Sequence, residues 1–150
     1  MPSTLLVTSR AFLDDDVLQP KYTCDGEEMT PPFTFSDIPP ETKSLAFVMD
    51  DPDSPGGVFT HWILFNMRPD VRELKENQLP SQVQMGINTA GQLTYYPPCP
   101  DKGEHRYIFT LYALDSLLSP GNKDRLTFNQ EIQNHVLASG QIQTRYIRTK

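Results

Sequence analysis

Residues 45–67 read LAFVMDDPDSPGGVFTHWILFNM and carry the clearest fold signal of the chain. The first part, residues 45–51, is apolar on both faces of an extended chain, as expected of a central strand that is covered on both sides. Pro, Asp, Ser and Gly at 52–57 favour a rigid turn. The last part, residues 58–67, alternates as a strand, with one face formed by Phe59, His61, Ile63 and Phe65 and the other by Trp62 and Leu64. We therefore expect two strands joined by a stiff loop.

The same rhythm of short apolar segments and turn residues continues through the rest of the chain. Pro accounts for 14 of 150 residues, about twice its usual ~5%, and Pro interrupts helices and central strands. A long strand is expected at 105–115, with one face formed by His105, Tyr107, Phe109, Leu111 and Ala113. Weaker strands are expected at 5–9, 33–36, 83–88 and 141–147. The pattern predicts an all-β sandwich with little helix.

One helix is signalled near the C-terminal end. Thr127 and Gln130 have the spacing of a capping box at a helix start. Apolar residues then recur at four-residue spacing, at Phe128, Ile132 and Val136. Gly140 suits a left-handed C-terminal cap. We expect this helix to cover a sheet.

The overall charge narrows the classes of partner. Thirteen Lys and Arg against 19 Asp and Glu give a formal net charge of −6, and so acidic a chain is a poor match for nucleic acid or for an anionic membrane. No apolar run approaches the ~20 residues that cross a bilayer, so we expect no stable membrane insertion. A length of 150 residues suggests one domain over 1–150.

The two cysteines bear on the cellular compartment. The first ten residues lack the basic start and the long apolar core of a secretory signal, so we expect a cytoplasmic location. Cytoplasmic thiols are normally kept reduced. Cys24 and Cys99 are therefore expected to be free, with a disulfide between them as the less favoured alternative.

Side chains that can carry chemistry stand at or near the ends of predicted strands, beside Pro-rich loops. They are Asp51, Asp53, His61 and His105. If the three strands are neighbours, two carboxylates and two imidazoles converge at one end of a sheet.

Three kinds of site fit that cluster. Two His with carboxylates suit zinc or non-haem iron, but the His-x-x-x-His and Cys-x-x-Cys spacings are absent from the sequence. Ser54 as nucleophile and His61 as base would make a hydrolase, but the sequence has no Gly-x-Ser-x-Gly elbow. The third is a small polar pocket for a ligand that carries both charges. In it an imidazole donates to a phosphate, a carboxylate orients that imidazole or meets an ammonium, and Tyr107 adds a hydroxyl donor.

Several motifs stand in order along the chain. They are YTCDG at 22–26, PP at 31–32, DPDSP at 51–55, HW at 61–62, Asn66, PCP at 98–100, GEHRY at 103–107 and LYALD at 111–115. In this combination the chain resembles the phosphatidylethanolamine-binding protein family, also called Raf kinase inhibitor-like, and in particular its bacterial and archaeal branch. The resemblance covers nearly the whole chain from Tyr22 onward.

The resemblance implies a fold and a site. The fold is mainly β, with a large central sheet packed with a smaller sheet, and a C-terminal helix. The site is a small anion pocket at one end of the large sheet, formed by Asp51, Asp53, His61, His105 and Tyr107 with a loop wall of Pro98 and Pro100. Cys24 and Asp25 are expected nearby.

The resemblance also implies a function. Members bind phosphate or phosphorylated head groups, and some modulate kinases or inhibit serine proteases. We therefore expect a binding or regulatory protein without catalytic activity, metal or cofactor, and keep a metal-dependent hydrolase as the alternative. The family often has Gly where Pro97 stands and Pro where Asp101 stands. Both differences weaken the expected hold on an anion, because Pro97 offers no backbone N–H and Asp101 adds a negative charge near the mouth, which Lys102 partly offsets.

Overall fold

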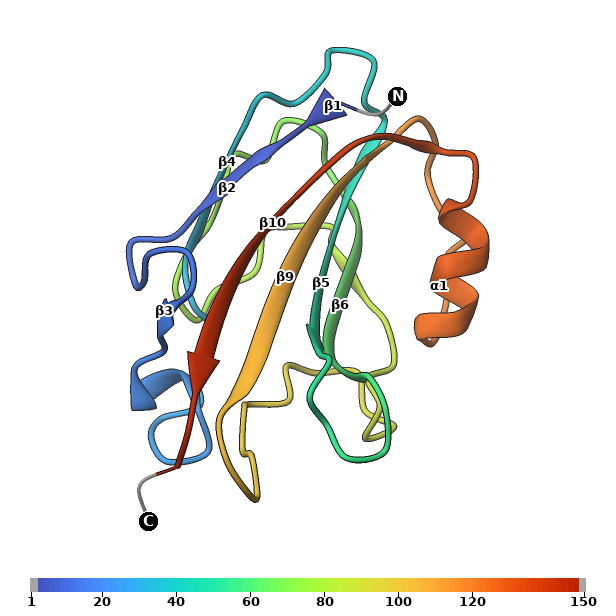
Figure 1. Ribbon diagram of the computed structural model, residues 1–150. Coiled ribbons are helices and arrows are strands. Elements are labelled where there is room, and N and C mark those ends of the chain that lie inside the picture. The colour runs from blue at the N-terminus through green and yellow to red at the C-terminus, as the bar shows by residue number, and fades with distance from the viewer. Residues whose placement is uncertain (1–2, 149–150) are drawn as a thin grey trace.

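The computed structural model describes residues 3–148, which form a large sheet, a small sheet and one α-helix (Figure 1). The outermost residues of the predicted domain, 1–2 and 149–150, lie outside the described residues. The large sheet has the order β1 (Ser3–Thr4), β10 (Val136–Tyr146), β9 (His105–Leu114), β5 (Ser44–Asp51), β6 (Phe59–Met67) and β8 (Gln84–Met85), and β3 (Asp16–Val17) also pairs with β10. The small sheet has the order β2 (Leu6–Thr8), β4 (Phe33–Ser36) and β7 (Glu73–Leu74). The helices are α1 (Arg125–Ile132) and the 3₁₀ turn η1 (Pro20–Tyr22).

The central strand is β5, which pairs antiparallel with β6 on one side and with β9 on the other. Leu45, Phe47 and Met49 belong to the core between the two sheets, whereas Ala46 and Val48 belong to the core beneath α1. The prediction of a strand covered on both faces is confirmed. The predicted mainly β architecture, with a large sheet, a smaller sheet and a C-terminal helix, is confirmed as well (Figure 1).

The predicted helix is shorter than its sequence pattern indicates. It ends at Ile132, and Val136 begins strand β10 instead of a further helical turn. The N-cap is Asp124 rather than Thr127, because an Asp124 carboxylate oxygen accepts the Thr127 N–H at 2.9 Å. Phe128 is buried against the large sheet, so the covering role is confirmed.

The prediction that Gly140 caps the helix is also wrong. The residue lies in β10, not at a helix cap. A Cβ atom at this position would stand 2.1 Å from the carbonyl oxygen of Leu5. The glycine is needed for the close approach of two backbones, a requirement that looks the same in sequence as a helix cap.

The two cysteines form a disulfide, so the expectation of free thiols is wrong. Cys24 and Cys99 are 75 residues apart in sequence, but their Cα atoms lie 5.5 Å apart. The expectation rested on the compartment alone, although the family resemblance had already placed Cys24 near the Pro98–Pro100 wall that contains Cys99. Among residues 3–148, no helix is long and apolar enough to cross a membrane.

Candidate functional site

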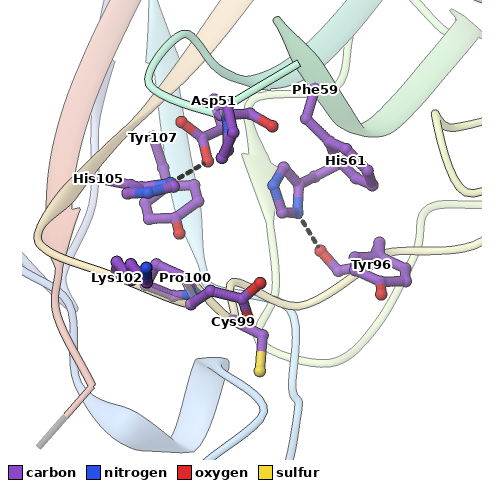
Figure 2. A pocket seen from close by; sticks show the side chains of 12 residues that line it. Asp51, Phe59, His61, Tyr96, Cys99, Pro100, Lys102, His105 and Tyr107 are labelled. Atoms are coloured by element: carbon purple, nitrogen blue, oxygen red, sulfur yellow. Dashed lines mark hydrogen bonds and ion pairs between the residues drawn. The ribbon is translucent and has the colours of Figure 1, made fainter. Parts of the chain in front are cut away.

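The ends of three strands meet at one end of the large sheet, where β5 ends and where β6 and β9 begin (Figure 1). A cavity of about 590 Å³ lies there, and Figure 2 shows the side chains that line it. These three strands are neighbours, and antiparallel pairing places those ends together. The cavity is lined by Asp51, Ser54, Pro55, Phe59, His61, Tyr96, Cys99, Pro100, Asp101, Lys102, His105 and Tyr107.

Asp51 orients His105. The Nδ1 atom of His105 donates to Asp51 Oδ2 at 2.7 Å, and both side chains are largely buried. The other oxygen, Oδ1, accepts the backbone N–H of Asp53 at 2.8 Å. With both carboxylate oxygens engaged and the proton held on Nδ1, the Nε2 atom of His105 is the nitrogen left for a ligand.

His61 reaches the cavity through an irregularity in β6. Met49 pairs with Trp62 and Asp50 pairs with Thr60, so His61 is an extra residue opposite β5. His61 packs edge-on against the ring of Tyr107, with centroids 5.3 Å apart, on the same side of the sheet as Trp62. The expected separation of His61 and Trp62 onto opposite faces is therefore wrong, because the bulge interrupts the alternation.

The ring of His61 is fixed by Tyr96. Nδ1 of His61 donates to the Tyr96 carbonyl oxygen at 2.6 Å, and the Tyr96 N–H donates to the His61 carbonyl oxygen at 3.0 Å. Burial lowers the pKa of His61, an effect only partly opposed by the Tyr96 hydrogen bond and the Asp51 charge. The ring is therefore neutral at pH 7, with its Nε2 facing the space beside Asp51 and Tyr107 (Figure 2).

Tyr107 stands between the two imidazoles. Its ring contacts His61 edge-on and stacks on His105 with centroids 6.5 Å apart. Burial raises the pKa of Tyr107 well above its usual value, and the charge of Asp51 raises it further. The phenol therefore keeps its proton and remains a hydroxyl donor.

Two predicted site residues do not line the cavity. Asp53 instead pairs with Arg106, accepting its Nε at 3.0 Å, its Nη2 at 2.9 Å and its backbone N–H at 2.8 Å. These contacts lower the pKa of Asp53 to about 2. Pro98 is buried behind the wall, where its carbonyl oxygen accepts the N–H of Cys24. Pro100 does line the cavity, as do Asp101 and Lys102 at its exposed mouth.

Cys24 and Asp25 lie behind the cavity rather than in its lining. Cys24 reaches the cavity through its bond to Cys99, which does line it. Asp25 accepts hydrogen bonds from Tyr146 Oη at 2.6 Å and from Arg148 Nη2 at 3.0 Å. Both residues therefore lie near the site, as predicted, but behind the cavity rather than in its lining.

Sequence reasoning missed two aromatic lining residues. Phe59 has its ring 4.8 Å from that of His61, and Tyr96 has its ring 5.4 Å from that of Phe59. The strand alternation that placed Phe59 with His61 could have identified the first. Tyr96 lies in an irregular loop and acts through its backbone carbonyl, which no side-chain pattern signals.

The metal interpretation lacks a ligand set in the described part of the chain. Within residues 3–148, no three His, Cys, Asp or Glu side chains are grouped as a metal ion requires. The Nδ1 atoms of His61 and His105 are both engaged by oxygen acceptors, so only their two Nε2 atoms remain, and no third ligand of the described residues is grouped with them. The arrangement is a cavity with two oriented imidazoles, a phenol and a mouth lysine.

Comparison with known proteins agrees with the fold and with the family resemblance of the sequence. The family model described as phosphatidylethanolamine-binding protein matches residues 8–147. A UPF0098 protein of Methanothermobacter thermautotrophicus is 42% identical over 141 residues, covering 89% of this chain and 93% of that protein. A UPF0098 protein of Chlamydia muridarum is 41% identical over 148 residues, covering 93% of this chain and 97% of that protein.

Solved structures give the same result. A chain described as a phosphatidylethanolamine-binding protein homologue of Chlamydia trachomatis has a TM-score of 0.93 and 36% identity, covering 97% of this chain and 99% of that chain. YbcL of Escherichia coli, described as a new member of the mammalian family, has a TM-score of 0.89 and 26% identity, covering 97% of this chain and 100% of that chain. The matched residues, the relatives and the shared fold agree, and the chain belongs to the phosphatidylethanolamine-binding protein family, in its bacterial and archaeal branch.

Proposed function

We propose that this protein binds a small oxyanion, phosphate or a phosphorylated head group, in the cavity at the end of β5, β6 and β9. The observation that carries the proposal is the pair of oriented imidazoles. His61 is fixed through Nδ1 by Tyr96, and His105 is fixed through Nδ1 by Asp51. Each ring keeps an Nε2 atom, which becomes an N–H donor when the ring is protonated. Charge-assisted N–H donors are suited to phosphate oxygens.

The other lining residues support an anion over a cation. Tyr107 adds a hydroxyl donor, and Lys102 adds an ammonium at the mouth that offsets the neighbouring Asp101 carboxylate. The one buried carboxylate, Asp51, already accepts from His105 and from the Asp53 amide. Its charge is directed to those donors, which reduces its repulsion of a bound anion.

Anion binding in this site is coupled to a proton. Burial lowers the pKa of His61, so at neutral pH its Nε2 carries a lone pair. A phosphate must either bring a hydroxyl proton to that nitrogen or bind together with protonation of the ring. Both routes need a proton that becomes scarcer as pH rises, so phosphate affinity falls between pH 5.5 and 8. A flat affinity over this range would remove the proton-coupled mechanism.

The proposed role is regulatory and cytoplasmic, with a kinase or a serine protease as partner, as in some members of the family. Such a partner would contact the protein surface around the occupied or empty cavity. A pull-down of purified kinase or protease with wild type and with His61→Ala distinguishes the two modes. Equal capture by both proteins means that the partner does not depend on the pocket.

An NMR titration at pH 6 tests the anion site. Inorganic phosphate and then phosphoethanolamine are added while the imidazole signals are followed. His61 and His105 are expected to shift saturably. His135 serves as an internal reference, because it is exposed and pairs with Asp115 beyond the opposite end of β9.

Two variants complete the test. His61→Ala is expected to weaken phosphate binding at least tenfold, whereas His135→Ala leaves it unchanged. Unchanged affinity in His61→Ala would remove this cavity from the proposal. Zinc-dependent shifts without phosphate shifts, together with chelator-sensitive release of phosphate from an aryl phosphate, would favour the metal-dependent hydrolase instead.

A further inference from the structure

Residues 97–103, here called the wall segment, form one side of the cavity. The segment contributes four of the lining residues, Cys99, Pro100, Asp101 and Lys102. Figure 2 labels Cys99, Pro100 and Lys102. It has no helix or strand of its own. The ammonium of Lys102 is the one Lys or Arg group among the lining residues. The position of this segment therefore sets both the shape and the charge of the site.

The wall segment has few attachments to the rest of the protein. Pro97, Pro98 and Pro100 have no N–H to donate. Within the described residues, the wall segment makes one hydrogen bond to another segment. In it the Cys24 N–H donates to the Pro98 carbonyl oxygen at 3.1 Å. Buried packing of Pro98 and Pro100 adds non-directional contact. The remaining attachment is the covalent bond between Cys99 and Cys24.

The other end of that bond is firmly held. Thr23, next to Cys24, donates from both its backbone N–H and its hydroxyl to the Pro20 carbonyl oxygen, at 3.0 and 2.9 Å. Asp25, on the other side, pairs with Arg148 at 3.0 Å. When the disulfide opens, the wall segment is thus the side that is free to move.

We infer that the Cys24–Cys99 disulfide is a redox control of the anion pocket, in which reduction releases the wall segment and weakens anion binding. This inference rests on the proposed function. The co-reactant is a dithiol, whose thiolate attacks one sulfur to give a mixed disulfide and a free cysteine thiol. Its second thiol resolves the mixed disulfide. Two electrons and two protons pass to the protein, which gains two thiols, and the dithiol becomes a disulfide.

Both cysteines are half-buried rather than enclosed, and the cytoplasm, the compartment proposed for this protein, contains dithiols of this class. The effect extends to the imidazole through Tyr96, which immediately precedes the wall segment and makes two hydrogen bonds to His61. Release of the wall segment removes the fixed position of Lys102, together with its neighbour Asp101, at the mouth and loosens the carbonyl that orients His61. Both changes lower phosphate affinity.

The first experiment compares phosphate affinity of the full chain in its oxidised and dithiol-reduced forms at pH 6. We expect reduction to weaken binding at least tenfold. The double variant Cys24→Ser/Cys99→Ser is expected to match the reduced form, with or without reductant. Equal affinity in the oxidised and reduced forms would overturn the inference while leaving the proposed anion site intact.

A second readout tests the redox control without phosphate. Hydrogen exchange is measured at the Tyr96 amide, which donates to His61, and at the Gly86 amide, which makes a comparable bond to Ile63 in β6 at 2.9 Å. Reduction is expected to speed exchange at Tyr96 at least tenfold and to leave Gly86 unchanged. Equal acceleration of exchange at both amides would mean that the disulfide stabilises the whole fold rather than the wall segment, and would overturn the inference. If oxidised protein binds no phosphate, the proposed function fails, and the amide comparison still decides whether the disulfide holds this wall.

Discussion

Strand β9 has a histidine–aspartate pair beside each of its ends, and the two pairs differ in surroundings rather than in geometry. At one end, His105 Nδ1 lies 2.7 Å from Asp51 Oδ2. Beyond the other, His135 Nδ1 lies 2.7 Å from Asp115 Oδ1. The side chains of the first pair are 11% and 5% exposed, and those of the second are 43% and 44% exposed. Equal hydrogen-bond lengths therefore do not show that both pairs belong to a ligand-binding site.

Burial changes what each pair can do. Water competes for the exposed pair and screens it, so its net contribution to stability is small. The buried pair adjoins a second imidazole, a phenol and a cavity. There a fixed donor geometry persists without competition from bulk water, which is a requirement for recognising a ligand.

The largest expected effect is on the free energy of unfolding, and it should differ between the two pairs. Asp51→Ala leaves the buried His105 Nδ1 and the Asp53 amide without their acceptor, and we expect a loss of about 3 kcal/mol in the free energy of unfolding. Asp115→Ala breaks an exposed pair and is expected to cost less than ~1 kcal/mol. Urea denaturation at pH 7 measures both.

The variant Asp51→Asn sharpens this comparison. It keeps an oxygen acceptor and the side-chain volume while removing the charge, so its loss should lie between those of wild type and Asp51→Ala. Similar losses in Asp51→Ala and Asp115→Ala would mean that water reaches both pairs equally, and the contrast drawn from burial would fail.

The sequence predicted the elements of this site better than their contacts. Alternation in 105–115 correctly put His105 and Tyr107 on one face of a strand, since β9 is regular from end to end. The same rule failed at His61, because a bulge depends on the pairing partner and leaves no mark in the strand's own sequence.

Long-range neighbours were also beyond local patterns. The Cys24–Cys99 bond joins loops that meet only after the sheets have assembled. The Tyr96 carbonyl that fixes His61 belongs to the backbone, which is the same for every residue type. What sequence patterns supply is the periodicity of regular strands, and the cavity is built mainly where regular strands give way to loops.

A smaller effect is expected on the pH dependence of the free energy of unfolding, through the buried imidazole of His61. Burial lowers the pKa of His61 below its ordinary 6.5. At a pH between the pKa of His61 in the folded chain and 6.5 in the unfolded chain, the unfolded chain binds more protons. The free energy of unfolding therefore falls as pH falls through 6.5. His61→Gln removes this contribution and is expected to flatten the dependence between pH 7 and 5, measured by urea denaturation.

His135→Gln is the matched control for this measurement, because it removes an imidazole that lies outside the cavity. Phosphate should act in the opposite direction, restoring part of the lost stability at pH 5.5, because the occupied site holds the additional proton. An unchanged slope in His61→Gln would assign the acid sensitivity to other groups and remove His61 as the proton-coupled residue.

The smallest effect is expected at Asp53, the half-buried second aspartate of the DPDSP motif at 51–55. Its pairing with Arg106 lowers its pKa to about 2 from an ordinary 3.8, so its stabilisation is fully present above pH 3.8 and is lost as pH falls towards 2. At pH 7, Asp53→Asn is expected to cost less than ~1 kcal/mol. Because Asp53 does not line the cavity, phosphate affinity should change by less than about twofold in physiological salt, where distant charges are screened. A tenfold loss of affinity would instead return Asp53 to the binding site where its motif placed it, and would show that the Asp53–Arg106 pair opens when a ligand binds.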